Sequence, residues 1–226
     1  MDNKFWYISP SNQDDNYGIN GYGAESSQMY ALAFEMTPHM ERCGLDFIIA
    51  DFEKNLTVRG NESNDAGCGN YLALHSNAGG GGAAWGHKAF YYSAGKGIAD
   101  AIHEELDAIG QESNRWSPVQ YNDLIETRYP NAPSCLLEVD FHDSAIGVDF
   151  IMKRRGEIAV AIVKAMCKVS GVAWVDPSPI PSHTPAGDKL YRVQVGSFRV
   201  KGNAEKLLQK LKGEGYDDAF ISEVEK

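Results

Sequence analysis

The chain lacks the features that mark several common classes of protein. Its 226 residues contain no apolar run near the roughly 20 residues that a membrane-spanning helix needs. The first residues have neither the basic nor the apolar region of a secretory signal. A net charge of −10 argues against a general nucleic-acid binder. We therefore expect a protein made in the cytoplasm, with no membrane span and no nucleic-acid partner.

Cysteine is also scarce, and its spacing is uninformative. The four cysteines form no CxxC pair. Two of them fall within apolar patterns, Cys135 in a strand pattern and Cys167 in a helix pattern. Reduced, buried thiols are therefore expected rather than a zinc or disulfide role.

What is present divides the chain into three parts. Residues 189–226 hold eight basic and six acidic side chains, whereas the rest of the chain is strongly acidic. Before them lies a segment with four prolines, which predicts a semi-extended linker at residues 176–188. We expect a catalytic domain over residues 1–175 and a small second module over residues 189–226.

Strand patterns alternate with helical patterns along the first part, which predicts an α/β fold with an open, twisted, mostly parallel sheet flanked by helices. Residues 51–70 are polar and irregular, although Asn64-Asp65-Ala66 could end a helix. The tail predicts a small α+β module of βαβ type, with strands at 190–196 and 219–221 around a helix at 203–213. Strands are expected at 5–8, 47–50, 71–75, 87–92 and 135–139, and helices from about residue 24, at 95–109 and at 151–169.

Two polar residues in strand patterns suggest a site. His75 ends an apolar run and is followed by a polar, glycine-rich loop, which places an imidazole at the carboxyl edge of the sheet, where ligands collect in such folds. Glu138 lies inside a second apolar run, where an unpaired buried charge is costly and needs a partner or a task. One such histidine and one such glutamate together favour a metal-assisted hydrolase.

Four segments carry a resemblance to a known family, in the right order. They are Ile8-Ser9-Pro10-Ser11-Asn12-Gln13, Tyr22-Gly23-Ala24-Glu25, Leu74-His75-Ser76-Asn77-Ala78 and Leu136-Leu137-Glu138-Val139-Asp140-Phe141-His142-Asp143. Over about residues 4–170 the chain resembles the zinc-dependent N-acetylmuramoyl-L-alanine amidases, and more narrowly the endolysin-type members of clostridial phages and prophages. The resemblance implies Zn²⁺ as the cofactor.

The resemblance also implies roles for individual residues. Glu25 and His75 correspond to metal ligands, and Glu138 corresponds to the general base. The family's first histidine ligand falls on Asp15, which either binds zinc through oxygen or marks a weakened or altered site; Asp14 is the fallback. Aspartate is an accepted zinc ligand, but two carboxylates make a harder, more negative set that reduces the Lewis acidity of zinc.

Three ligands would leave a fourth position open for water, whose proton Glu138 would take. The residues also allow blander interpretations. Glu138 could be a buried ion-pair partner of Arg128 or Lys153, and Glu25 a favourable charge in a first helical turn. His142 and Asp143 are expected to support the ligands. The other histidines, expected to face solvent, are His39, His87, His103 and His183.

The tail has a resemblance of its own. Tyr191-Arg192-Val193-Gln194-Val195-Gly196-Ser197-Phe198 and the helix pattern after it look like the first half of a SPOR (sporulation-related repeat) domain, a family that binds peptidoglycan. A half-length module leaves a strand edge and an apolar helix face uncovered, which predicts a homodimer formed through the tail. The residues expected to bind cell wall or to form the dimer are Tyr191, Val193, Val195, Phe198, Leu207, Leu211 and Phe220.

Together these features predict a peptidoglycan hydrolase that cuts the amide between N-acetylmuramic acid and L-alanine. Its partner would be bacterial cell wall, reached after holin-dependent release or lysis. The main alternative is an amidase-fold protein that binds cell wall without cutting it. A metal hydrolase acting on another amide is the third possibility.

Overall fold

The computed structural model describes residues 2–110, 117–177, 201–213 and 219–223. The chain forms two compact units, residues 1–177 and residues 178–226. Within the described residues, no helix has the length and apolarity needed to cross a membrane.

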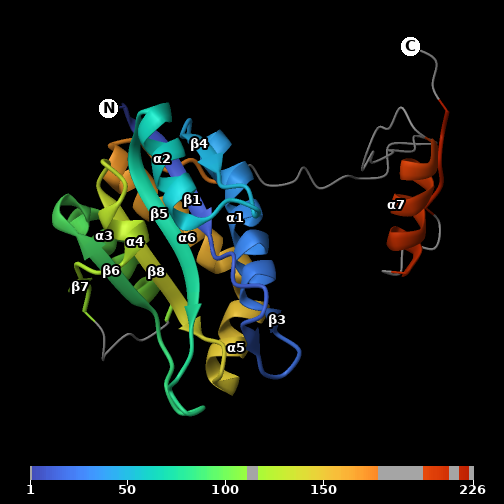
Figure 1. Cartoon of the computed structure of the whole chain (residues 1–226), viewed down its shortest axis with the longest axis horizontal. Helices are drawn as coiled ribbons and strands as arrows, with labels where there is room; N and C mark the ends of the chain where they lie inside the picture. The colour runs from blue at the N-terminus through green and yellow to red at the C-terminus, as the bar shows by residue number, and fades with distance from the viewer. Residues whose placement is uncertain (1, 111–116, 178–200, 214–218, 224–226) are drawn as a thin grey trace. The chain divides into compact units, whose positions relative to one another are not determined.

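The first unit is built on a six-stranded sheet with the order β4-β1-β5-β8-β6-β7 (Figure 1). The four strands from β4 to β8 run parallel, β6 runs antiparallel to β8, and β7 runs parallel to β6. The strands are β1 (Asp2–Pro10), β4 (Asp46–Ile49), β5 (Cys68–Asn77), β6 (Lys88–Tyr92), β7 (Val119–Gln120) and β8 (Ser134–Phe141).

Helices cover both faces of this sheet. One face packs against α1 (Glu25–Arg42), α3 (Lys96–Ala108) and α6 (Arg155–Ser170), and the main apolar core lies between them. The other face carries α2 (Leu56–Ala66) and the short α4 (Ile125–Arg128), over a smaller apolar cluster. Helix α5 (Ala145–Lys153) follows β8, and a hairpin of β2 (Tyr17–Gly18) and β3 (Gly23–Ala24) precedes α1. The predicted fold class is confirmed.

Two sequence predictions differ in detail from the structure. The segment expected to be polar and irregular, residues 51–70, contains the helix α2, which ends at Ala66, as the possible helix end at Asn64-Asp65-Ala66 indicated. Asn55 caps its start by accepting a hydrogen bond from the Val58 amide, and Gly67 ends it with φ of 69°. The weak apolar pattern of this segment does not predict the rest of the helix. The helix expected at 151–169 is two helices, α5 and α6, which meet at Arg154, where the backbone leaves helical geometry. The prediction that the cysteines are buried is confirmed for all four.

The second unit contains α7 (Lys201–Gly213). Its apolar residues Leu207 and Leu211 are partly buried, and Phe220 is 61% exposed. A strand was expected at residues 219–221, but residues 219–223 carry no strand assignment; the strand expected at residues 190–196 lies outside the described residues. Four of the predicted contact residues also lie outside them, namely Tyr191, Val193, Val195 and Phe198.

Candidate active site

The sheet brings His75 and Glu138 together. His75 lies near the carboxyl end of β5, and its Cα is paired with that of Glu138 on the parallel neighbour β8. Side chains alternate along a strand, so His75 is on the same face as Tyr71 and Ala73, which belong to the smaller cluster under α2 and α4. Two residues 63 positions apart thus share one edge and one face of the sheet.

Glu25 reaches the same edge from a different element. The β2–β3 hairpin leads directly into α1, and Glu25 is the first residue of that helix. Its side chain is buried, and its Oε1 lies 2.9 Å from Nδ1 of His75. Asn16 donates a hydrogen bond from Nδ2 to the other oxygen, Oε2, at 2.7 Å. A buried carboxylate with these contacts is more than a favourable charge in a first helical turn.

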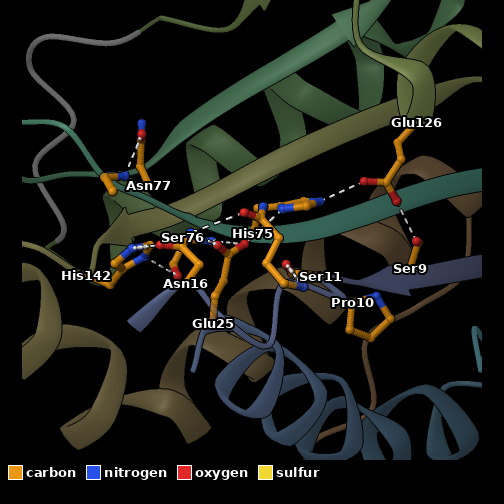
Figure 2. Close-up of polar contacts among 12 residues, drawn as sticks. Ser9, Pro10, Ser11, Asn16, Glu25, His75, Ser76, Asn77, Glu126 and His142 are labelled. Carbon is orange, nitrogen blue, oxygen red and sulfur yellow. Dashed lines mark hydrogen bonds and ion pairs between the residues drawn. The ribbon is translucent and has the colours of Figure 1, made fainter. Parts of the chain in front are cut away.

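A second carboxylate, which the sequence did not predict, holds the other side of the imidazole. Glu126 in α4 is buried, and its Oε2 lies 2.7 Å from Nε2 of His75. In Figure 2, Glu25 and Glu126 approach the ring from opposite sides. The other oxygen of Glu126 accepts a hydrogen bond from the Ser9 hydroxyl. The buried Arg59 guanidinium in turn donates to Ser9 Oγ at 3.0 Å, so the network has a cationic end.

These contacts set the protonation of the cluster. Burial by itself lowers the pKa of His75, but the hydrogen bonds to Glu126 and Glu25 outweigh it and raise this pKa to about 10. Burial likewise acts to raise the pKa of Glu25, while the bond and charge of His75 lower it below its ordinary value. At neutral pH both ring nitrogens of His75 therefore donate to carboxylates. A metal ion bound at Nδ1 has to displace that proton, so binding weakens as pH falls.

Glu138 is a buried carboxylate without a full set of partners. Its Oε2 is shielded from solvent and accepts no hydrogen bond from the described residues. Burial raises its pKa to about 7, a value suited to taking and giving a proton near neutral pH. Within the described part of the chain neither Arg128 nor Lys153 pairs with it; Lys153 bonds Asp149 at 2.7 Å. The charge of His75, and to a lesser extent that of Lys88, its antiparallel neighbour on β6, lowers this pKa in part.

The loop between β1 and β2 carries the remaining predicted ligand. Asp15 is exposed there, and neither a hydrogen bond nor an ion pair joins it to the described residues around it. Its neighbour Asn16 faces inward: Nδ2 bonds Glu25, and Oδ1 lies 3.1 Å from Nε2 of His142. His142 is buried, and its Nδ1 lies 2.8 Å from the Ser76 hydroxyl. His142 therefore helps to position Asn16, the residue that donates to Glu25.

The donor atoms at this edge fit a zinc ion in part. His75 Nδ1 and Glu25 Oε1 converge, and the remote nitrogen of His75 is held by a carboxylate, the arrangement that orients histidine ligands in metal sites. Nitrogen and carboxylate oxygen are donors that zinc accepts. The buried Oε2 of Glu138 lies unbonded on the neighbouring strand. A third donor at Asp15 requires the exposed loop to turn its side chain inward.

Two further features border the site. The glycine-rich loop after β5 is fixed to the end of β8, since the Gly79 and Gly86 amides donate to Asp143 and Asp140 at 3.0 and 2.9 Å. Beside the start of α1 lies a groove of about 610 Å³. The groove is lined by Asp14, Tyr17, Ala24, Ser26, Ser27, Tyr30, Phe34 and Phe52. Aromatic side chains and one carboxylate thus face solvent next to Glu25.

The histidines expected to face solvent do not all do so. His87 is fully buried, and its Nε2 lies 2.9 Å from Nδ1 of His103, which is 24% exposed. His39 is partly buried against the Trp174 ring. His183 lies outside the described residues. The expectation was wrong for His87 because the residue before β6 faces α3, a contact that the sequence pattern alone does not show.

Known proteins resemble this chain along most of its length. It is 24% identical over 227 residues to the N-acetylmuramoyl-L-alanine amidase CwlM of Bacillus licheniformis, an alignment that spans 95% of this chain and 83% of that protein. Residues 187–226 match the family of the SPOR domain.

Solved structures show the same fold. The catalytic domain of CwlV, an N-acetylmuramoyl-L-alanine amidase from Bacillus (Paenibacillus) polymyxa var. colistinus, superimposes with a TM-score of 0.67 at 18% identity, over 75% of this chain and 99% of that one. The catalytic domain of the CD27L endolysin targeting Clostridia difficile gives 0.60 at 21% identity, over 73% and 96%.

Proposed function

We propose that this chain is a zinc-dependent peptidoglycan hydrolase that cleaves the amide bond between N-acetylmuramic acid and L-alanine. Its relatives are named N-acetylmuramoyl-L-alanine amidases. The observation that carries the proposal is the cluster at the carboxyl edge of the sheet. There His75 lies between two buried carboxylates, and Glu138, with its raised pKa, is paired with it in register on the next strand. The similarity to amidases supports the same activity.

Glu25 and His75 would hold the zinc ion, with Asp15 as the proposed third ligand. When bound, zinc supplies Lewis-acid chemistry: it polarises the scissile carbonyl and lowers the pKa of the attacking water. Glu126 keeps the His75 ring in position through its Nε2 contact. Asn16 positions Glu25 in the same way, because the hydrogen bond from its side-chain amide to Oε2 fixes the carboxylate. These two residues position ligands and do not touch substrate.

Glu138 handles the protons of the reaction. As a carboxylate it takes a proton from the attacking water, and as the acid it returns that proton to the departing amine of L-alanine. A pKa of about 7 makes both forms accessible near neutral pH. The burial of Oε2 keeps bulk water from competing for the proton.

Glycan would lie in the groove beside α1. Tyr17 and Phe34 are 70% and 60% exposed, which is unusual for large aromatic side chains and suits contact with the apolar faces of sugar rings. Because the groove includes Ser26 and Ser27, which directly follow Glu25, a sugar bound there would lie next to the metal ligands. The stem peptide would then extend toward Glu138.

The tail would bind cell wall, as its match to the SPOR domain family suggests. We keep two finer assignments as proposals. The first is the clostridial endolysin type, with action on the wall after holin-dependent release or lysis, favoured by the likeness to the CD27L catalytic domain. The second is a homodimer through the tail, for which the partly buried Leu207 and Leu211 of α7 are candidate contacts. Light scattering on the full chain tests it: a monomer at tens of micromolar would end the idea.

Digestion of purified peptidoglycan tests the activity. The full chain should release new amino groups that prove to be N-terminal alanine, without new reducing sugar ends, and a chelator should stop the release. Glu138→Gln should release almost none, and Glu62→Gln is its matched control for the loss of a carboxylate. Glu62 accepts hydrogen bonds from Lys54 and Tyr7 and has no contact with His75 or Glu138 among the hydrogen bonds of the described residues. Wall binding without release of amino groups would instead identify a protein that recognises cell wall and does not cut it.

A further inference from the structure

A second group of metal-ligand side chains lies on the opposite face of the sheet. His87 comes directly before β6, and its neighbour Lys88 is paired with Glu138 on the active-site face. Because side chains alternate, His87 points the other way, to the face that carries Ala89 and the main core. There it meets α3, whose His103 and Asp107 are one turn apart on the same side of the helix.

The geometry of this group suits a divalent cation. His87 Nε2 lies 2.9 Å from His103 Nδ1 and 3.8 Å from Asp107 Oδ1. Zinc bound tetrahedrally at about 2.0–2.1 Å separates its ligand atoms by about 3.3 Å. These two distances, from His87 to its two partners, fall about half an ångström below and above that value. One ligand atom from each of the three residues lies within 4.8 Å of the others.

The burial of the three residues is also consistent with a bound divalent cation. His87 is fully buried, whereas His103 and Asp107 are 24% and 43% exposed. The group therefore has an anchored inner end and an open outer end through which an ion and a water ligand can enter. Two imidazoles and a carboxylate form a donor set that selects zinc over magnesium or calcium, which prefer oxygen alone.

We propose that His87, His103 and Asp107 form a second zinc site, separate from the active site, which ties the start of β6 to α3. The glycine-rich loop at the cleft rim ends at Gly86, whose amide is held by Asp140, and His87 is the next residue. An ion there would fix the end of that loop and the strand that places Lys88 opposite Glu138. We assign the site a structural role, because its ligands join the start of β6 to α3.

Zinc binding by the full chain, with any histidine tag removed, tests the proposal without relying on activity. The His75→Gln variant loses the active-site ligand and should still bind one zinc ion. The double variant H75Q/H103Q should bind it more than about 100-fold more weakly, since even groups that only support a ligand change affinity by about 10–100-fold. The converse single variant, His103→Gln, should retain any active-site zinc, which separates failure of this site from failure of the proposed function.

Two controls and a second measurement complete the test. His39→Gln and Asp100→Asn change a histidine on α1 and an aspartate on α3 outside the group, and neither should alter zinc binding. Saturating zinc should raise the melting temperature of H75Q and leave that of H75Q/H103Q unchanged. Asp107→Asn provides a milder variant if H75Q/H103Q does not fold. An H75Q protein that folds and binds no zinc would overturn the proposal.

Discussion

The sheet carries a histidine cluster on each face, and the two differ in what surrounds the imidazole. His75 lies between two buried carboxylates and beside a third, Glu138, that has an unbonded buried oxygen. His87 contacts one imidazole and one half-exposed carboxylate, on the far side of the sheet. Metal ligands alone form a site that binds a metal ion but does not catalyse a reaction. The first cluster has in addition a buried acid, Glu138, whose pKa lies near neutrality, and for that reason we propose that the chemistry takes place there.

The largest effect is expected from a substitution that removes this buried acid. Glu138→Gln keeps the shape of the side chain and abolishes its proton transfer. Activity on purified wall should fall by about 10²–10⁴-fold, the usual contribution of a general base. Zinc content should not change, because the residue is not a ligand. Comparison with Glu62→Gln controls for the loss of a carboxylate on the same sheet face. Near-normal turnover by E138Q would remove Glu138 from the mechanism.

The same substitution should alter the pH dependence of stability. Glutamate has an ordinary pKa of 4.5, and burial raises that of Glu138 to about 7. The folded state binds this proton more tightly, so the resulting stabilisation is complete below 4.5 and is lost as pH rises through about 7. In metal-free protein, E138Q should gain up to about 3 kcal/mol in free energy of unfolding over wild type on going from acid to about pH 8. Urea unfolding with a chelator measures it; a difference independent of pH would contradict the assignment.

Glu126→Gln tests the carboxylate that contacts Nε2 of His75, on the side of the ring opposite Glu25. The amide cannot hold the Nε2 proton of His75 as strongly, so the imidazole loses its fixed tautomer and orientation. Zinc affinity should fall by about 10–100-fold, as for other groups that orient metal ligands. Zinc titration of E126Q beside E62Q gives the result. Equal affinities in the two variants would show that Glu126 supports the fold and not the ligand.

The smallest expected effect concerns Asp15. Replacing it with His supplies the imidazole that the resemblance implies at this position, and should tighten zinc binding because nitrogen suits zinc better than a second carboxylate oxygen. Asp15→Asn is the matched control, since it removes the charge without adding an imidazole. If D15H binds zinc more weakly than wild type, the aspartate is an adapted ligand. If D15H and D15N both match wild type, this position does not ligate the metal.

The parts of this site that local pattern determines could be predicted from the sequence. His75 ends an apolar run before a glycine-rich loop, so the strand pattern predicts it at the carboxyl edge of the sheet, and Glu138 is a charge inside a second apolar run. Glu25 opens a helix whose apolar spacing is regular. The α/β pattern predicts a mostly parallel sheet, and the structure adds that β5 pairs with β8, which brings His75 and Glu138 together.

Other parts depend on contacts that have no local pattern. Glu126 belongs to a helix of four residues, and nothing in Ile125–Arg128 distinguishes it from an exposed turn. Its role follows from the network through Ser9 to Arg59, which joins segments more than 60 residues apart. The orientation of His87 depends likewise on α3 packing against the sheet. For the tail, the strand pattern at residues 190–196 lies outside the described residues and stays a prediction.

A crystal structure of the zinc-loaded full chain, with data collected at the zinc absorption edge, tests the central claim most directly. We predict an anomalous peak bonded to His75 Nδ1 and Glu25, with Glu138 facing it and not bonded to it. A peak at His87 and His103 would confirm the second site in the same experiment. Zinc-loaded crystals with no peak at His75 and Glu25 would contradict the account, because the cluster with the buried acid would then lack the metal on which its proposed chemistry depends.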